Sequence, residues 1–283
     1  MLAGKDGKKQ YFKNAKQEVF VQPIEIKKAV KGKDIQLTID ATLQFYAYKY
    51  LVEGIKNNKA EAGTVVILDN EKGEVLAIAS YPSYNPNNPN RKIQKNRALV
   101  DAYELGSVIK PIVLSKAIDL NLISPHEEIY IPRRLNLDDK IIVDSKNHEQ
   151  LTPQEIIAVS SQIGASKIAL QLGYSNLKNN YFEYGFTKPV SLNFPSSAFG
   201  YMNIKEKVAD KELASLGYGY GITISPFQIA SAYSVFANDG YLKDFKLLKN
   251  DEDISRKVIS ADSADYVLEA LRQVVKDGTG KAA

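Results

Sequence analysis

The sequence predicts an α+β fold, in which a β-hairpin lies at the centre of a sheet and helices precede and follow it. The first observation is a pair of apolar, β-branched segments at residues 63–69 and 74–80, separated by the turn-forming residues 70–73. Two such segments joined by a short turn are the pattern of a hairpin. The second observation is that apolar residues recur at helical spacing in several other segments, often just after a residue that can cap a helix.

The elements around the hairpin follow from local patterns. Apolar and polar residues alternate before residue 41, which predicts strands, whereas helical spacing after Asp40 predicts a capped helix. In chain order we expect short strands within the lysine-rich residues 1–36, a strand at 34–40, a helix at 41–55, the hairpin, and an irregular loop at 81–97, which is rich in Pro and Asn.

The second part of the chain is predicted to be mainly helical. Its clearest start signal is Thr152-Pro153-Gln154-Glu155, in which Thr caps the helix, Pro occupies the first turn and Glu completes a capping box. We expect a helix at 107–120, short strands within 121–150, helices at 152–159 and 165–172, a loop at 181–199, a flexible glycine-rich turn at 217–221, a helix from Ser225-Pro226 to 238–240, and a last helix at 263–275.

Composition excludes several classes of function. The chain has no cysteine, which excludes thiol catalysis, disulfides and cysteine-based zinc sites, and suits an oxidising compartment. Its two histidines, His126 and His148, are too few for a histidine metal cluster, and no cofactor is implied. A net charge of +4 with scattered lysines does not indicate a nucleic-acid partner. No apolar run reaches the roughly 18 residues of a membrane span, and the N-terminus does not have the pattern of a signal peptide.

The most informative motif is Ser-Val-Ile-Lys at 107–110, which follows Gly106 and begins an apolar run. Residues three apart lie on one face of a helix, so the Lys110 amine can reach the Ser107 hydroxyl and take its proton. A neighbouring base is the usual means of activating a serine nucleophile. The pattern alone has low specificity, because Ser175 and Lys178 match it as well.

Three further segments could belong to the same site. They are Asn96-Arg97-Ala98, Ser160-Ser161-Gln162-Ile163-Gly164 and the turn at 217–221. Each also has a purely structural explanation: a surface position for Asn96 and Arg97, helix caps for the serines, and a plain loop for the glycines. Ser175 is explained most simply as a helix cap.

In their order, these segments resemble the class B penicillin-binding proteins, the division-type peptidoglycan transpeptidases. The resemblance covers roughly residues 34–283, and its segments are 34–44, 62–79, 81–87, 96–98, the nucleophile motif at 103–111, 217–240 and 274–280. It implies a penicillin-binding/β-lactamase-like transpeptidase fold, with an antiparallel sheet flanked by helices. Residues 1–33 would then be the end of a preceding non-catalytic dimerisation or pedestal region and a linker.

The resemblance also implies an activity, a D,D-transpeptidase that cross-links peptidoglycan stem peptides in cell division and cell-wall synthesis. Ser107 would attack the D-Ala-D-Ala carbonyl, Lys110 would be the neutral base or a proton relay, and Ser160 would pass the proton to the leaving group. Gly106 and Gln162 would contact the substrate. A neutral Lys110 requires a lowered pKa, and the Ser107 N–H would supply half of an oxyanion hole.

Partners and location follow from the same resemblance. β-Lactam antibiotics would acylate the nucleophile and stall there. Other division proteins would be partners, and nucleic acid would not. The parent protein would be anchored in the inner membrane and face the periplasm.

The sequence departs from the family pattern in three places. Leu105 stands where the family usually has Pro. The second motif, usually Ser-x-Asn, ends here in Gln162, whose arm is one methylene longer, and a small misplacement can cost about 10²-fold in rate. No Lys-Thr-Gly or Lys-Ser-Gly occurs before the last residue, Ala283. We therefore expect a truncated chain that lacks the C-terminal strands and the second oxyanion donor. Such a chain should be marginally folded and inactive or nearly so.

Three alternative functions stay open. The first is a non-catalytic scaffold of the division or elongation machinery, with Gln162 as a sign of lost activity. The second is a β-lactamase or β-lactam sensor, which shares the nucleophile pattern. The third is a plain serine hydrolase that uses His126 or His148 as its base.

Overall fold

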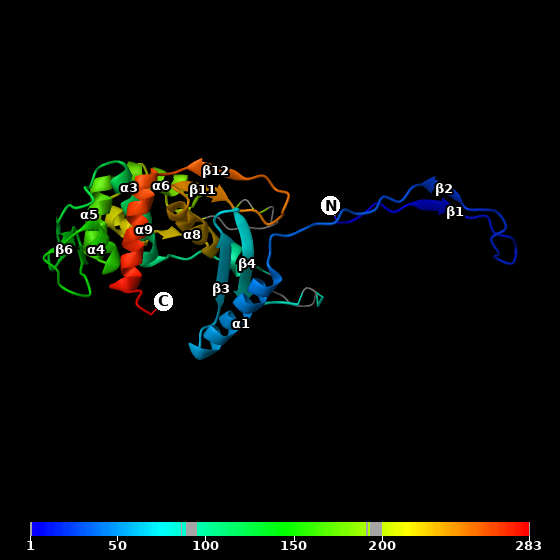
Figure 1. The fold of residues 1–283 in the computed structure, drawn as a ribbon, viewed down its shortest axis with the longest axis horizontal. Helices are drawn as coiled ribbons and strands as arrows, with labels where there is room; N and C mark the ends of the chain where they lie inside the picture. Colours follow the sequence, from blue (N-terminus) through cyan, green and yellow to red (C-terminus); the bar gives the residue numbers. More distant parts are fainter. Residues whose placement is uncertain (1, 86, 89–94, 191, 193–199, 283) are drawn as a thin grey trace.

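The computed structural model describes residues 2–85, 87–88, 95–190, 192 and 200–282. Figure 1 shows a body of helices with the hairpin of β3 (Gly63–Asp69) and β4 (Glu74–Tyr81) at one side and α1 (Ala41–Asn57) against that hairpin. The segment before α1 extends away from this body and carries a small hairpin of its own.

The β3–β4 hairpin is covered on both faces. Its strands are antiparallel, with Val66 opposite Ile78, and a register shift follows Ile67. One face packs against α1 and the other against α2 (Arg97–Val100) and α8 (Pro226–Tyr233). The sheet has two strands among the described residues, so the predicted position at the centre of a wider sheet is not observed there.

The remaining helices lie in the body of the molecule. In chain order they are the 3-10 helix η1 (Gly106–Ile109), α3 (Lys110–Asp119), α4 (Pro153–Ala158), α5 (Gln162–Leu172), α6 (Tyr174–Glu183), α7 (Asp210–Gly217), the 3-10 helix η2 (Ser234–Ala237) and α9 (Ala261–Lys276).

The other strands are short and form two-stranded antiparallel pairs. They are β1 (Lys8–Gln10) with β2 (Ile24–Lys27), β5 (Ile129–Tyr130) with β8 (Gln150–Leu151), β6 (Leu135–Leu137) with β7 (Lys140–Ile142), β9 (Tyr201–Met202) with β10 (Ile222–Thr223), and β11 (Tyr241–Asp244) with β12 (Ile254–Lys257).

Helix α3 lies in the centre of the main core. Eight of its ten residues are buried, and it packs against α5, α6 and α9. A helix that is apolar on nearly all sides belongs inside a protein. The residue at its first position, Lys110, is therefore carried into the interior by the packing of the helix that follows it.

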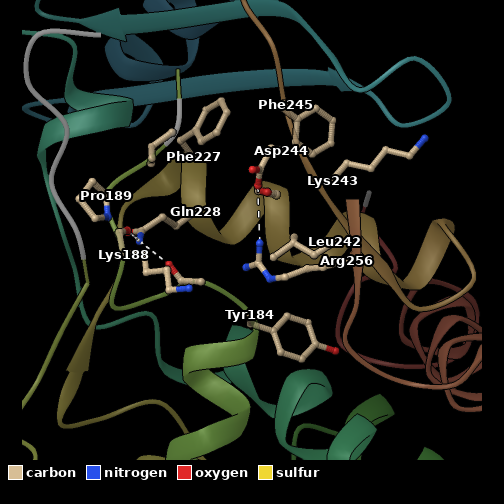
Figure 2. Close-up of a pocket in the computed structure, with 13 residues that line it drawn as sticks. Tyr184, Lys188, Pro189, Phe227, Gln228, Leu242, Lys243, Asp244, Phe245 and Arg256 are labelled. Atoms are coloured by element: carbon tan, nitrogen blue, oxygen red, sulfur yellow. Dashed lines mark hydrogen bonds and ion pairs between the residues drawn. The ribbon is translucent and has the colours of Figure 1, made fainter. Parts of the chain in front are cut away.

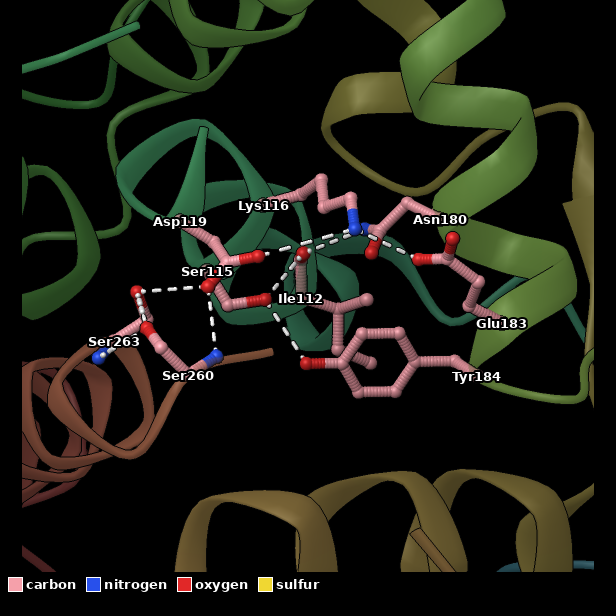
Figure 3. Close-up of polar contacts among 9 residues, drawn as sticks. All are labelled: Ile112, Ser115, Lys116, Asp119, Asn180, Glu183, Tyr184, Ser260 and Ser263. Carbon is pink, nitrogen blue, oxygen red and sulfur yellow. Dashed lines mark hydrogen bonds and ion pairs between the residues drawn. The ribbon is translucent and has the colours of Figure 1, made fainter. Parts of the chain in front are cut away.

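Polar contacts fix the other end of α3 to its neighbours (Figure 3). The Oδ1 atom of Asp119 accepts a hydrogen bond from the Ser260 N–H at 2.7 Å, directly before α9. The hydroxyls of Ser115 and Tyr184 lie 2.9 Å apart in the interior. Buried polar groups that are paired in this way help to specify one arrangement of the helices.

Most of the predicted helices are confirmed. Helix α1 begins after Asp40, whose Oδ1 accepts the Leu43 N–H at 2.9 Å. The capping box of Thr152 and Glu155 begins α4, and a second capping box at Ser225 begins α8. The last helix, α9, covers the predicted residues 263–275.

Several expectations about individual elements are wrong. Residues 34–40 form no regular strand, because Leu37 and Thr38 meet a loop at residues 247–248 through isolated contacts. Arg97 begins a short helix instead of lying in a loop. Ser175 lies inside α6 and does not cap it.

Other boundaries shift or were not anticipated. Helix α5 begins at Gln162, three residues earlier than expected, and α7 and strands β9 to β12 have no counterpart in the prediction. Helix α6 runs into the start of the loop predicted at 181–199. That loop and the one at 81–97 lie partly outside the described residues.

The N-terminal segment forms the predicted short strands, β1 and β2. Residues 2–31 are all exposed, and within the part of the chain that the structure describes their hydrogen bonds join them only to one another. None of the described helices is both long and apolar enough to cross a membrane.

Candidate active site

Ser107 and Lys110 lie on consecutive turns at the junction of η1 and α3. The Ser107 side chain is exposed, whereas Lys110, the first residue of α3, is 2% exposed. Gly106, just before the serine, has a φ of +57°, a backbone conformation that glycine adopts without strain. The serine is thus presented at the surface while the lysine enters the core.

The Lys110 ammonium group is bonded to Ser160. Its Nζ donates to the Ser160 carbonyl oxygen at 2.6 Å and to the Ser160 Oγ at 3.0 Å. Since an ammonium group has three N–H donors, one stays unused among the described residues, and no hydrogen bond joins Lys110 Nζ to Ser107 there. Such bonds are often long before substrate binds.

Burial lowers the pKa of Lys110 to about 8, because water no longer solvates the charged form. The negative charge of Asp144 acts in the opposite direction and partly restores the pKa. Near neutral pH a measurable fraction of Lys110 is therefore neutral and able to accept a proton.

Ser160 lies in the break between α4 and α5. Its φ of +60° is unusual for a residue with a side chain, and such strained residues cluster at functional sites. Ser161 caps α5 by accepting the Gly164 N–H at 2.8 Å, which matches the cap role considered for it. Gln162 is the first residue of α5, with an exposed side chain that makes no hydrogen bond among the described residues.

Asp144 is a residue of this site that the sequence did not reveal. Its Oδ2 accepts the Ser161 hydroxyl at 2.5 Å, and its Oδ1 accepts the N–H groups of Gln162 at 2.6 Å and Ile163 at 3.1 Å. A carboxylate at a helix N-terminus is favoured by the unpaired N–H groups there. No motif distinguishes this aspartate within residues 121–150, so only its contacts identify it.

The glycine-rich turn at 217–221 packs directly on the nucleophile motif. Gly219, with a φ of +98°, accepts the Gly106 N–H through its carbonyl at 3.2 Å. A Cβ atom at Gly219 would lie 2.0 Å from the Gly106 carbonyl oxygen, so a larger residue cannot fit without movement. The Gly221 N–H donates to Glu104 Oε1 at 2.8 Å. The turn expected to be flexible is therefore bonded to the loop before Ser107.

Asn96 and Arg97 have structural partners. The Asn96 side chain caps α2 by accepting the Ala98 N–H, and also accepts the Ser80 hydroxyl at 3.1 Å. Arg97 pairs with Asp101 at 2.7 Å.

The two histidines were considered as alternative bases for the nucleophile. Neither His126 nor His148 is hydrogen-bonded to Ser107 among the described residues. The geometry therefore gives no support to a hydrolase that uses a histidine base.

A separate cavity of about 220 Å³ lies between α8 and strands β11 and β12 and contains none of the predicted site residues (Figure 2). Two of its polar side chains are already engaged. The Gln228 amide donates to three backbone carbonyls, and the Arg256 guanidinium lies 3.6 Å from Asp244 and donates to the Glu183 carbonyl. Lys188 is the charged side chain of this lining that has no partner among the described residues.

Residues 63–283 match the family model of the penicillin-binding protein transpeptidase domain. The chain is 35% identical to a probable peptidoglycan D,D-transpeptidase PbpC of Pseudomonas aeruginosa over 99% of its own length and 50% of the relative. It is 31% identical to the peptidoglycan D,D-transpeptidase FtsI of Escherichia coli K12, over 87% of this chain and 42% of that protein. The chain thus spans about half the length of the curated relatives it matches.

Solved structures show the same fold. Penicillin-binding protein 3 of Mycobacterium tuberculosis, complexed with aztreonam, superposes with a TM-score of 0.83 and 25% identity, covering 90% of this chain and 62% of that one. The predicted α+β transpeptidase fold is confirmed. The chain belongs to the family of penicillin-binding protein transpeptidase domains.

Proposed function

We propose that the protein containing this chain is a serine D,D-transpeptidase that cross-links peptidoglycan stem peptides. The observation that carries the proposal is the buried Lys110, which lies one turn after the exposed Ser107. Its pKa is lowered to about 8, and its amine is bonded to Ser160. A nucleophile beside a base that is itself oriented by a third group is the arrangement of a covalent serine enzyme. Family membership supports the same function.

In the proposed reaction, the Ser107 Oγ attacks the carbonyl carbon between the two terminal D-Ala residues. Neutral Lys110 takes the hydroxyl proton, and Ser160 passes a proton to the leaving amine as the C–N bond breaks. An ester joins Ser107 to the stem peptide at this stage. The amine of a second stem peptide then attacks the ester, forms the cross-link and returns the proton to the serine.

The backbone supports the assignment of Ser107 to substrate binding, whereas the assignment of Gly106 stays a prediction. The Gly106 N–H is already bonded to Gly219, whereas the Ser107 N–H has no acceptor among the described residues and is free to bind the developing oxyanion. We assign Gln162 to the substrate amide because its side chain is exposed at the start of α5 and has no partner among the described residues. Penicillins and other β-lactams would acylate the same serine.

The protein expressed from its complete gene, labelled with a fluorescent penicillin, tests this function. Ser107→Ala is expected to reduce covalent labelling by at least about 10³-fold, since the substitution removes the oxygen that forms the ester. Ser175→Ala is the matched control, because Ser175 and Lys178 share the Ser-x-x-Lys spacing but lie within α6. Mass spectrometry of the labelled peptide should place the adduct on Ser107.

Other outcomes of the same experiment identify other functions. Wild-type protein that is never labelled would indicate a non-catalytic scaffold. Rapid release of hydrolysed penicillin would indicate a β-lactamase. A hydrolase with a histidine base would be indicated if His126→Ala or His148→Ala is no longer labelled while a Lys110 variant is still fully labelled.

We propose a periplasmic location at the inner membrane, with other division proteins as partners. The support is that the proposed substrate lies outside the cytoplasmic membrane and that the relative in Escherichia coli is named FtsI. The absence of cysteine suits that oxidising compartment. Cell fractionation should recover the full gene product with the inner membrane, and protease added to spheroplasts should degrade it.

A further inference from the structure

A second cavity, of about 340 Å³, lies at the end of the glycine-rich turn that packs on the nucleophile loop, and it is assigned no role above. It is formed by strand β7, helix α7, residues 203–208 and the end of the glycine-rich turn. Its walls are apolar where Val208, Leu216 and the ring of Tyr220 line it, and three lysines surround it, which are Lys140, Lys205 and Lys211.

The cavity shares its walls with the segments that position Ser107 and Ser160. Gly221, in its lining, donates to Glu104, three residues before the nucleophile. Strand β7 ends two residues before Asp144, which accepts hydrogen bonds from the start of α5. The walls of this cavity are therefore connected to both segments that position the proposed reaction site.

Two of the three lysines are neutralised by neighbouring carboxylates. Lys211 pairs with Asp139 at 2.6 Å, and Lys205 pairs with Glu212 at 2.8 Å.

Lys140 differs from them. Its Nζ donates to the Ser215 Oγ at 2.8 Å and lies 5.5 Å from the centre of the Tyr218 ring, and it has no carboxylate partner among the described residues. Among the described residues that line the cavity, Lys140 is therefore the lysine that makes no ion pair, and it lies beside apolar walls.

We propose that this cavity is a substrate subsite that binds an upstream carboxylate of the stem peptide, with Lys140 as the residue that pairs with it. This inference rests on the proposed function, because a stem peptide is the ligand that would reach both Ser107 and this cavity. A single carboxylate matches the one lysine of the lining that makes no ion pair among the described residues, and a short aliphatic chain matches the apolar walls. The Ser215 hydroxyl and the Tyr218 ring hold the ammonium group in place for that contact.

The subsite makes a prediction about substrate choice. A hydrogen bond to a charged group that is partly removed from water changes affinity by about tenfold or more. Peptides with the carboxylate should therefore bind about tenfold more tightly than peptides in which an amide replaces it, and this preference should depend on Lys140.

The test measures dissociation constants by calorimetry on the full gene product. Two synthetic stem-type peptides that end in D-Ala-D-Ala are compared, one with an upstream glutamyl carboxylate and one with glutamine in its place. We expect the wild type to prefer the carboxylate peptide by about tenfold, and Lys140→Met to bind both equally. Lys188→Met, which removes a lysine from the cavity of Figure 2, is the matched control and should keep the preference.

Separate readouts distinguish the two proposals. Equal affinity of the wild type for both peptides, or an unchanged preference in Lys140→Met, overturns the subsite. If Ser107 is not labelled by penicillin but the preference exists and requires Lys140, the subsite stands and the transpeptidase function falls. Lys140→Gln should lose the preference as Lys140→Met does. An unchanged thermal unfolding midpoint in both variants would show that the loss is not caused by misfolding.

Discussion

Lys110 keeps its amine in the interior of the protein, and the consequence is a specific dependence of the reaction on pH. Only the neutral amine can accept the Ser107 proton. With a pKa of about 8, the acylation rate should fall about tenfold for each pH unit below 8 and become constant above it. Rapid-mixing measurements of penicillin labelling between about pH 6 and pH 9.5 would give this profile.

The control for that profile is Lys110→Arg. Arginine keeps the positive charge but does not lose its proton in this range, so labelling should be lost at every pH. A wild-type rate that does not vary with pH, or an arginine variant that reacts normally, would show that another group is the base.

Patterns along the chain predict the site residues that belong to local motifs, but not the contacts between distant segments. The spacing of Ser107 and Lys110 is local, and the Ser160–Gln162 segment is a visible helix break. The contact of Lys110 with Ser160 spans 50 positions and exists only in the folded chain. Asp144 carries no motif, and its role comes entirely from three hydrogen bonds that it accepts across 17 to 19 positions.

The start of α5 depends on Asp144, so a single substitution there should affect both stability and pH dependence. Asp144→Asn removes a carboxylate from the helix N-terminus and weakens three hydrogen bonds, which should lower the free energy of unfolding by about 1–2 kcal/mol. It also removes the charge that raises the pKa of Lys110, so the midpoint of the acylation profile should move to lower pH. Denaturant unfolding and the pH profile measure the two effects.

Asp253→Asn provides the comparison, because Asp253 is a surface carboxylate that pairs with Lys246. Surface ion pairs contribute little, so stability should change by less than about 0.5 kcal/mol and the pH profile should not move. A shift of the profile to higher pH in Asp144→Asn would contradict the proposed electrostatics.

The glycine-rich turn makes a second prediction at the level of a structural element. Gly219→Ala places a Cβ atom on the Gly106 carbonyl oxygen at a backbone conformation that disfavours alanine. We expect a loss of about 2 kcal/mol or more in unfolding free energy and slower penicillin labelling, since the turn supports the nucleophile loop.

Gly54→Ala is the matched substitution. Gly54 lies inside α1, where an added methyl group would meet no atom within 4 Å, so alanine should stabilise the helix by about 0.5–1 kcal/mol. If Gly219→Ala and Gly54→Ala change the unfolding free energy and the labelling rate alike, the close approach of Gly219 to Gly106 does not determine the position of the nucleophile loop.

Elements with strong local signals were predicted well, and those defined by their partners were not. The capped helices α1, α4, α8 and α9 have start signals that act within one turn. Strands β9 to β12 have two to four residues each, and neither pair is joined by a tight turn. A strand this short has no readable alternation, so its register follows from tertiary packing.

Across the whole molecule, burial separates the N-terminal segment from the rest. Residues 2–31 contribute nothing to the core, and contacts with the body begin at residues 36–38. The Thr38 hydroxyl is buried and donates to the Val75 carbonyl at 2.8 Å. We infer that the unit that folds independently begins close to residue 34, the boundary that the sequence indicated.

Deletion of residues 2–33 should therefore leave both the unfolding midpoint and the rate of penicillin labelling of the full gene product unchanged, because no buried contact is lost. Deletion of residues 2–40 removes the Thr38 contact and the Asp40 cap of α1, and should lower the free energy of unfolding by about 2–4 kcal/mol. Differential scanning calorimetry of the two truncated proteins measures the difference. A large loss of stability in the shorter deletion would mean that the N-terminal hairpin packs on the body and that the domain begins earlier.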